Sequence, residues 1–389
     1  MNAQSRPLEG IRVVTFEHFI AGPYCTQMLA DGGAEVIKVE RPGVGDPRRA
    51  YIPKWEADGV SVSSGFVSYN RGKKSVTLDL GAEPDVTAVR QLIGTADVVV
   101  SNFRPGLLAA KGLDLVALTE ERTDLVACEI TGFGRQGPYA EWPAFDTVIQ
   151  AMSGLSSLLG ETAESPPGLA PMGSSDILAG TYAAMGILMA LVGRARDGKG
   201  THLDVAMYDV VAAFLERPLT LHEATGEVPM RGADRFSPVG SFLAGDGEWV
   251  ALVIPTDEHW RRCCTAIGRS DLVDHPDLDT MLKRSAAMQD VILPALEAWA
   301  AGMTAEGAAT ELRDAGQPAG TVQTIDQVRR CPQLEARGLF TPVPDPVTDA
   351  PDGTPLQLPR LPLAPSTWRV EAERTPRLGE HNDEILGSL

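Results

Sequence analysis

The sequence is poor in cysteine and histidine. Only five cysteines occur in 389 residues, and none of them forms a C-x-x-C pair. An odd, scattered set of this kind does not make a disulfide framework and is typical of a reducing compartment. The six histidines show no H-x-H or H-x-x-x-H spacing, so we predict no metal site.

Basic residues are scarce as well. There are 34 Lys and Arg against 52 Asp and Glu, which gives a net charge of -18. This balance excludes a nucleic-acid partner or an anionic membrane surface, because either needs a positive field. The apolar stretch at residues 183–192 is too short to span a bilayer, and the first ten residues lack a hydrophobic signal core. We therefore expect a cytoplasmic protein.

What the sequence does contain is an alternation of strands and helices. Strands are predicted at residues 11–16, 35–40, 75–80, 97–102 and 125–130, and helices at 22–33 and 84–96. Such alternation predicts a parallel sheet covered by helices on both faces. The predicted fold class is α/β, with a Rossmann-like large domain.

The middle of the sequence, from residue 145 to 315, has a different pattern of helices and strands. Two longer helices are predicted at residues 145–159 and 176–196, and the second is apolar on nearly all sides, so we expect it to be buried. A hairpin at 241–254 turns at Asp246-Gly247 and precedes amphipathic helices up to 315. This α+β segment predicts a second, smaller domain inserted in the chain.

Two glycine motifs carry competing interpretations. Residues 132–137 read G-x-G-x-x-G after a strand, yet Pro138 and Pro143 stand where a nucleotide-binding helix would open. A dinucleotide site is therefore not expected. Gly22, between a strand and a helix, either starts the helix or admits a ligand close to the backbone.

Cations recur near strand ends in this acidic chain. Lys38 and Arg41 follow one strand, Lys73 and Lys74 begin another, and Arg104 follows a third. Their shared position favours an anion site at one edge of the sheet.

Asp176 opens the apolar helix after a loop of small residues. It has two interpretations: an acidic cap of the helix, or an ionised nucleophile that the helix dipole keeps charged. Taken alone, the pattern favours the cap.

Several motifs together resemble the class III coenzyme A transferases, a family that includes formyl-CoA transferase, carnitine CoA-transferase and alpha-methylacyl-CoA racemase. The resemblance runs along nearly the whole chain. It is carried by A-G-P-Y at 21–24, G-A-E-V-I-K-V-E-R-P at 33–42, N-R-G-K-K-S at 70–75, N-F-R-P-G at 102–106, G-F-G-R-Q-G-P-Y at 132–139 and L-G-E-H at 378–381.

The resemblance implies roles for individual residues. Asp176 would be the catalytic carboxylate, while Arg41 and Lys73 would contact the phosphorylated adenosine end of coenzyme A. Asn102 and Phe103 would lie along the pantetheine, next to Arg104. Many members carry a basic residue where this chain has Ala110, so Lys111 beside it becomes the candidate for a diphosphate contact.

The resemblance also implies a homodimer of two interlocked rings. The large domain would begin with residues 1–225, the small α+β domain would be 226–325, and a return segment at 326–389 would rejoin the large domain. The expected substrates are an acyl-CoA and a carboxylic acid.

The implied activity moves coenzyme A from acyl-CoA to an acid through an acyl-aspartyl anhydride and an aspartyl-CoA thioester. Two alternatives stay open: an alpha-methylacyl-CoA racemase, and a coenzyme A-binding protein without catalysis. Racemases of the family carry a histidine as one of two acid/base groups where this chain has Phe145, which cannot carry a proton. This difference favours the transferase.

Overall fold

The computed structural model describes residues 6–389 except 58, 161, 163, 233–237, 346, 350–352 and 371–372. The chain divides into two compact units. The large unit comprises Met1–Ser156, Leu169–Glu227 and Pro332–Leu389, and the small unit comprises Ser157–Gly168 and Val228–Cys331.

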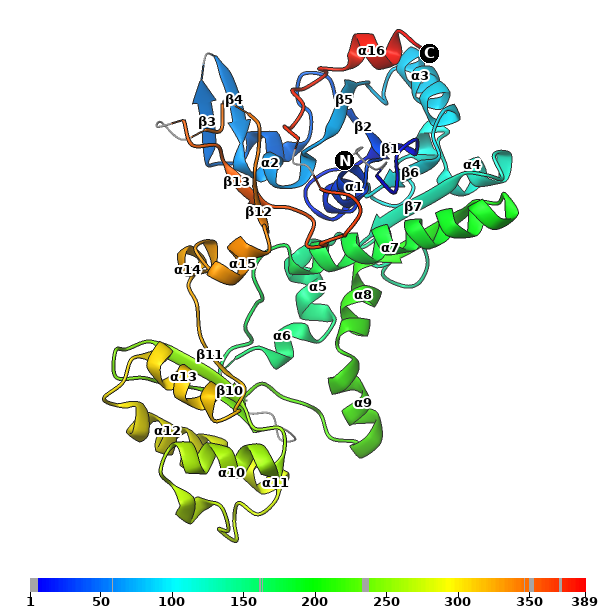
Figure 1. The fold of residues 1–389 in the computed structure, drawn as a ribbon. Helices are drawn as coiled ribbons and strands as arrows, with labels where there is room; N and C mark the ends of the chain where they lie inside the picture. The colour runs from blue at the N-terminus through cyan, green and yellow to red at the C-terminus, as the bar shows by residue number, and fades with distance from the viewer. Residues whose placement is uncertain are drawn as a thin grey trace. The chain divides into compact units, whose positions relative to one another are not determined.

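The large unit is built on a six-stranded parallel sheet. Its strands are β1 (Arg12–Phe16), β2 (Glu35–Glu40), β5 (Lys73–Thr77), β6 (Val98–Ser101), β7 (Val126–Thr131) and β8 (Thr201–Ala206). They lie in the order β5-β2-β1-β6-β7-β8, and every neighbouring pair is parallel (Figure 1). The predicted α/β class is confirmed.

Helices cover both faces of this sheet, because successive strand residues point to opposite sides. Val13 packs with α1 (Ala21–Asp31), α7 (Ser174–Asp197) and α8 (Met207–Phe214). Val14 packs on the other face with α3 (Glu83–Gly94), α4 (Leu115–Glu121) and α16 (Asn382–Leu386). Both residues are fully buried, so the sheet has two apolar cores.

Two helix predictions are corrected. The helix expected at 145–159 is broken into α5 (Asp146–Met152) and α6 (Leu155–Leu158), because Gly154 adopts φ 92° between them. Helix α7 is not buried all round. Its small residues, such as Ala183, face the sheet, whereas Met189 is 67% exposed and Val192 is 71% exposed.

Helix α7 is long and apolar enough to cross a membrane by length and composition alone, a test that the core helix of a soluble protein also passes. One face of α7 packs on α1 and on β7 and β8. Its exposed apolar side has no partner within this chain's described residues. The cytoplasmic location stays a prediction.

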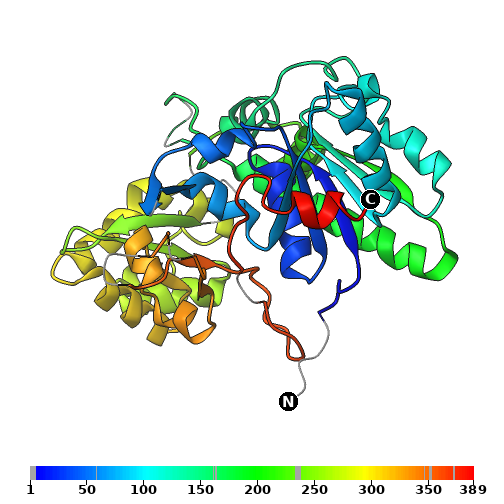
Figure 2. The same cartoon turned by 90° about the horizontal axis from the view of Figure 1, so that it is seen from above.

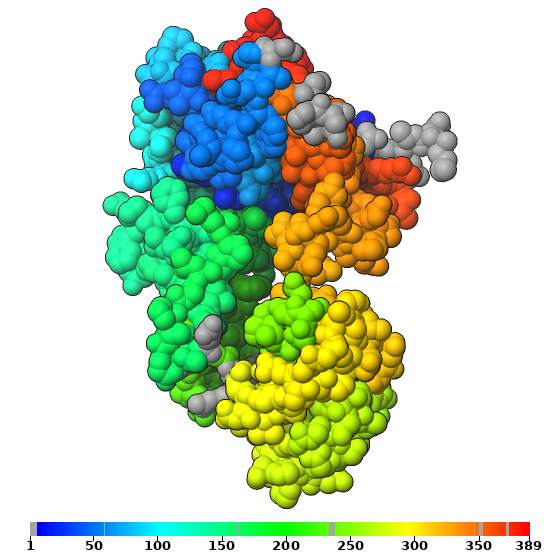
Figure 3. All heavy atoms as spheres, turned by 90° about the vertical axis from the view of Figure 1, so that its left-hand side faces the viewer, coloured from blue at the N-terminus to red at the C-terminus, as the bar shows by residue number. Residues whose placement is uncertain are grey.

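The C-terminal segment returns to the large unit. The Asn382 side chain bonds the backbone N–H and the hydroxyl of Thr77 at 2.8 Å each, and the backbone N–H of Ser75 donates to Nδ1 of His381 at 3.1 Å. Figures 2 and 3 show the red C-terminal residues beside the blue N-terminal part. A short antiparallel pair, β12 (Phe340–Pro342) and β13 (Gln357–Pro359), precedes this contact.

Antiparallel pairs and short helices complete the two units. In the large unit, β3 (Lys54–Ala57) pairs with β4 (Val60–Ser63), and α2 (Ser64–Asn70) follows.

In the small unit, β9 (Val239–Leu243) and β10 (Trp249–Val253) form the predicted hairpin, and β11 (Ala319–Thr321) pairs with β10. The small unit's helices include α10 (Asp257–Ala266), α12 (Leu293–Ala300) and α13 (Ala305–Asp314). They enclose a separate core around Trp260 and Leu296.

Candidate active site

A cavity of about 680 Å³ opens in the large unit at the carboxyl ends of β1, β6 and β7. β1 has β2 on one side and β6 on the other, so the chain order reverses next to β1. Parallel sheets bind ligands in the crevice outside such a switch point. The cavity therefore lies where this fold would hold a substrate.

Most of the residues around the cavity are apolar. They include Phe19, Ile20, Leu107, Trp142, Phe145 and Met207. The ionisable ones are His18, Arg48, Tyr51, Arg104, Asp146 and Asp176. Because the lining is poor in polar groups, the few charges have large effects on one another.

Asp176 lies in the first turn of α7 and lines the cavity, but it does not cap the helix. The residue at the N-cap position is Gly173, held at φ 90°. The Asp146 carboxylate from α5 accepts hydrogen bonds from the backbone N–H groups of Gly173 and Ser175, each at 2.7 Å. Asp146 thus satisfies the helix terminus, and the Asp176 carboxylate remains available to a substrate.

Burial raises the pKa of Asp176 to about 7, the nearby charge of Asp146 adds to the increase, and Arg48 opposes it. The carboxyl group therefore ionises less readily than the helix dipole alone would lead one to expect. The physical reason is that desolvation of the charged form exceeds the stabilisation from Arg48. A perturbed carboxyl group in a cavity is typical of a functional site.

The Asn102 side chain holds the loop that follows β1 by two hydrogen bonds. Its side-chain oxygen accepts the backbone N–H of His18 at 2.8 Å, and its side-chain amide donates to the carbonyl oxygen of His18 at 2.8 Å. Phe103 packs its ring on the His18 imidazole with 4.7 Å between centroids. Burial lowers the pKa of His18, whose imidazole lines the cavity.

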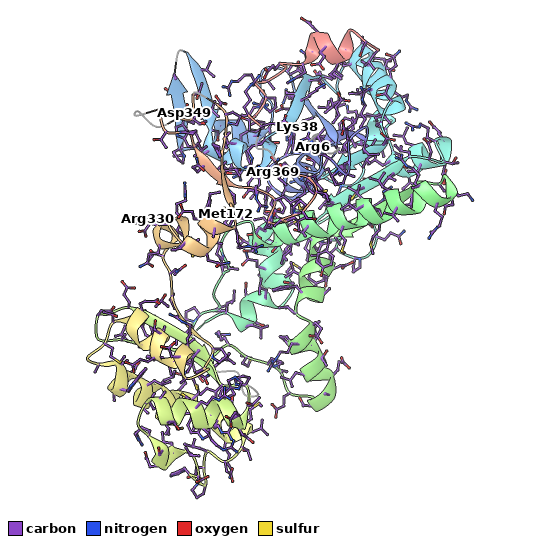
Figure 4. All side chains as sticks on the ribbon, viewed as in Figure 1. Arg6, Lys38, Met172, Arg330, Asp349 and Arg369 are labelled. Carbon is purple, nitrogen blue, oxygen red and sulfur yellow. The ribbon has the colours of Figure 1, made fainter. Side chains whose placement is uncertain are left out.

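A buried ion cluster underlies this edge of the sheet. The Lys73 ammonium donates to Glu17 at 2.7 Å, to the carbonyl oxygen of Pro23 at 2.9 Å and to Asn70 at 3.2 Å. Lys38, labelled in Figure 4, pairs with Asp46 at 2.8 Å. All four charged side chains, Glu17, Lys38, Asp46 and Lys73, are fully buried.

The cluster fixes the charge states of its members. Burial opposes ionisation of Glu17, but the charges of Lys73 and Lys38 lower its pKa to about 2. Burial lowers the pKa of Lys73 to about 8, against the attraction of Glu17. Removing one partner would leave an uncompensated buried charge.

The same cluster shapes the cavity wall. Asp46 accepts the backbone N–H of Phe19 at 3.3 Å and that of Arg48 at 2.9 Å. Phe19 adopts φ 64°, a left-handed conformation that is uncommon for a bulky residue. Its ring meets Phe145 edge-on at 5.5 Å. The ion cluster therefore positions Phe19 and Arg48, which both line the cavity.

The residues proposed from sequence fall into two sets. Asp176, Asn102, Phe103 and Arg104 line the cavity together. Arg41, Lys73 and Lys111 do not line it: Arg41 and Lys111 are exposed elsewhere on the surface, and the Lys73 ammonium is inside the ion cluster. Their contacts with coenzyme A stay predictions.

The glycine motifs now have structural explanations. An added Cβ on Gly22 would lie 2.9 Å from Asn102 Cγ and 2.9 Å from Glu17 Cβ, so the missing side chain makes room for protein neighbours. The segment 132–137 forms turns, and the next helix in the described chain starts only at Asp146. The G-x-G-x-x-G pattern is thus not followed by a helix that could hold a pyrophosphate.

Sequence reasoning missed Arg48, His18 and the capping role of Asp146. Arg48 follows β2 and belongs to the same run of cations near strand ends, which was the signal that could have found it. The contact between Asp146 and α7 joins residues nearly thirty positions apart, and no local pattern predicts it.

No group of three or more potential metal-ligating side chains occurs within the described ranges of the chain. This finding leaves the predicted absence of a metal untested.

Comparisons with known proteins agree along the whole chain. A model of CoA-transferase family III matches residues 8–382. Succinate–glutarate CoA-transferase of Agrobacterium fabrum is 35% identical, covering 98% of this chain and 96% of the relative. Succinyl-CoA:mesaconate CoA-transferase of Haloarcula hispanica is 34% identical, covering 97% and 95%. A solved CAIB/BAIF family protein from Brucella suis superposes with a TM-score of 0.85 at 33% identity, covering 99% of this chain and 100% of that one.

Proposed function

We propose a covalent course for the reaction, from the premise that this chain belongs to CoA-transferase family III and is a CoA-transferase. In this course the carboxylate of Asp176 is the nucleophile. The observation that carries the proposal is the position of Asp176 at a cavity in the sheet's switch point, with the helix cap supplied by another residue. A carboxylate that is not needed for capping is free for chemistry.

The first half of the reaction transfers the donor acyl group. A carboxylate oxygen of Asp176 attacks the thioester carbon of acyl-CoA, and the C–S bond breaks to release the coenzyme A thiolate. The product is an acyl-aspartyl anhydride. The thiolate then attacks the aspartyl carbonyl carbon, which forms an aspartyl-CoA thioester and releases the donor acid as its carboxylate.

The second half reverses these steps with a new acid. The acceptor carboxylate attacks the aspartyl-CoA thioester and expels the thiolate, and the thiolate then attacks the acceptor's carbonyl carbon. The new acyl-CoA leaves, and Asp176 is again a free carboxylate. Each step exchanges one leaving group on an activated carbonyl, which replaces one difficult carboxylate-for-thiolate exchange by easier ones.

The coenzyme A portion has candidate contacts on the cavity wall. Arg104 is exposed at the cavity rim, where a cation suits the phosphates. The Phe103 ring offers an apolar surface to the pantetheine. The Asn102 side chain is occupied by the His18 backbone, so its contribution is to hold this loop in place. Arg41 and Lys111 remain proposals for the adenosine end, outside the cavity.

The test is to trap the intermediate. Incubation with acyl-CoA and hydroxylamine should modify the peptide that contains Asp176, and mass spectrometry would identify the hydroxamate. Asp176→Asn should bind coenzyme A but lose transfer and the modification. Unmodified Asp176 in a protein that turns over, or an active Asn variant, would remove this assignment.

The cavity also bears on the racemase alternative. Phe145 lines the cavity where the racemases of the family have a histidine, and the adjacent Asp146 carboxylate accepts two backbone amides. Neither side chain is placed as a second acid/base group. An alpha-methylacyl-CoA in deuterated water should therefore show no rapid inversion at the alpha carbon.

A homodimer with interlocked rings, which the family resemblance implies, is also proposed. The exposed apolar side of α7, including Tyr182, Met185, Met189 and Val192, is the kind of surface that protein partners cover. Sedimentation without detergent should give twice the chain mass of 41.4 kDa. A monomer would contradict this proposal.

A further inference from the structure

We propose that Arg48 binds the second carboxylate of a dicarboxylic acyl group and so selects dicarboxylic acids as substrates. The inference rests on the proposed function, because the acyl group must reach Asp176. It assigns to Arg48 a role in specificity that is separate from the covalent chemistry.

Arg48 is held in a fixed position at the cavity. Its backbone N–H donates to Asp46 at 2.9 Å, and its side-chain Nε donates to the carbonyl oxygen of Gly65 at 2.6 Å. The guanidinium carbon lies 5.0 Å from the ring centroid of Tyr51 and 5.1 Å from that of Tyr69. Three separate contacts orient one planar cation, which lowers the entropy lost when it binds an anion.

Among the residues that the structure describes, Arg48 has no ionic partner, because no carboxylate lies within the 4.0 Å of a salt bridge. The neighbouring Arg49, by contrast, pairs with Glu40 at 2.6 Å. A half-buried guanidinium that lines the cavity is suited to a carboxylate ligand, which it can bind with two parallel hydrogen bonds.

The location of Arg48 fits an acyl group rather than the phosphates. Arg48 is half-buried and lines the same cavity as Asp176, and its charge lowers the pKa of that carboxyl group. Arg104 also lines the cavity but is exposed, which places it at the rim. A four- or five-carbon dicarboxylate in extended form places its second carboxylate carbon only roughly 4–5 Å from the carbonyl carbon that reacts.

The apolar surroundings make this cation selective. With Phe19, Ile20 and Phe145 also lining the cavity, an acyl chain that ends in a methyl group gains apolar contact but leaves the charge of Arg48 without an anionic partner. A dicarboxylic chain supplies that partner. A bound methyl group would also displace water from the half-buried guanidinium without replacing its hydrogen bonds, which is costly, so the site favours the dicarboxylic chain.

The experiment has a binding arm and a turnover arm, both at pH 8.5, where Asp176 is ionised. In the binding arm, calorimetry compares succinyl-CoA with butyryl-CoA, which differ only at the end of a four-carbon chain. The protein is Asp176→Asn, so no chemistry occurs. We expect succinyl-CoA to bind roughly 10- to 100-fold more tightly, and Arg48→Met to abolish this ratio.

In the turnover arm, the acceptors are succinate and butyrate, with acetyl-CoA as donor. Arg48→Met should lower kcat/KM for succinate roughly 10- to 100-fold, mostly through KM, and should change the value for butyrate less than about threefold. Arg48→Lys should recover part of the preference. Arg261→Met, which removes an exposed arginine of the small unit that pairs with Glu258 at 3.1 Å, should match the unaltered protein.

Each outcome decides one proposal. Equal binding of the two CoA esters overturns the role of Arg48, even if Arg48→Met does not fold. So does an equal loss of kcat with both acids, because it would place Arg48 at the reaction centre. Tight, Arg48-dependent binding of succinyl-CoA with no transfer to any acid would instead refute the proposed reaction and leave the dicarboxylate site intact.

Discussion

Replacing Asp176 by asparagine should stabilise the protein at high pH while abolishing transfer. The side chains have almost the same shape, so the change removes one ionisable group without opening a cavity. The pKa of Asp176 is raised from 3.8 to about 7, mainly by burial. Ionising this carboxyl group therefore costs more free energy in the folded protein than in the unfolded chain.

The size of the expected stabilisation follows from the shift in the pKa of Asp176. About three pKa units at about 1.4 kcal/mol each give an upper limit of about 4 kcal/mol, and relaxation of the surroundings will reduce it. The sign follows from proton binding. Between pH 4 and 7 the folded protein holds a proton on Asp176 that the unfolded chain has lost, so the free energy of unfolding decreases as pH rises through this window.

The assay compares urea unfolding of the original protein and Asp176→Asn at pH 4.5 and pH 8.5. At pH 4.5 both carry a neutral side chain in the folded state, and the advantage of the variant should be small. At pH 8.5 the variant should be more stable by about 1–4 kcal/mol. Such a gain at the expense of function is typical of active sites.

Asp146→Asn is the matched control. Its carboxylate accepts the N–H groups of Gly173 and Ser175, and an asparagine can accept only one of them well. We expect a loss of about 1–3 kcal/mol at pH 8.5, the opposite sign. If Asp176→Asn gives the same stability difference at both pH values, the carboxyl group is not desolvated as the structure indicates, and the reasoning fails.

Three further predictions concern the same region. The value of kcat/KM should fall about tenfold per pH unit below pH 7, because protonated Asp176 cannot attack; a flat profile between pH 5.5 and 8 would contradict this. Lys73→Met should cost about 3–5 kcal/mol in chemical denaturation because it removes the nearer of two cations paired with the buried Glu17 and leaves Lys38 at 3.4 Å, and Glu17→Gln in the same chain should restore most of it. A loss of coenzyme A affinity without a loss of stability would show instead that Lys73 contacts the ligand. Gly22→Ala should cost about 1–3 kcal/mol, because its Cβ would lie 2.9 Å from both Asn102 and Glu17; unchanged thermal stability would count against that crowding.

The sequence predicts some features well because they depend on local patterns. Runs of β-branched residues mark β1 and β6, and the Asp246-Gly247 turn marks the hairpin of β9 and β10. The long helix after the Asp176 loop follows from its continuous apolar content. The same content gave a wrong expectation of complete burial, because composition does not say which side of a helix meets the sheet.

The roles of the charged residues, by contrast, cannot be predicted from local patterns. Lys38 lies within β2, Lys73 begins β5 and Arg48 lies in the segment between these two strands, and nothing local indicates which of them meets a ligand. Tertiary contacts give Lys38 and Lys73 buried acidic partners and leave Arg48 at the cavity wall. Residues from distant segments therefore decide whether a cation stabilises the fold or contacts a ligand.

The sequence by itself determined the α/β class, the alternation of strands and helices, the family resemblance and the choice of Asp176. These rest on periodicity and on motifs of consecutive residues, which the chain carries wherever it folds. Only the tertiary structure decided that Asp146 caps α7, that Asp176 is desolvated enough to have a pKa of about 7, and that Arg48 faces the cavity. Desolvation and ion pairing depend on which atoms lie within a few ångströms, and only folding brings those atoms together.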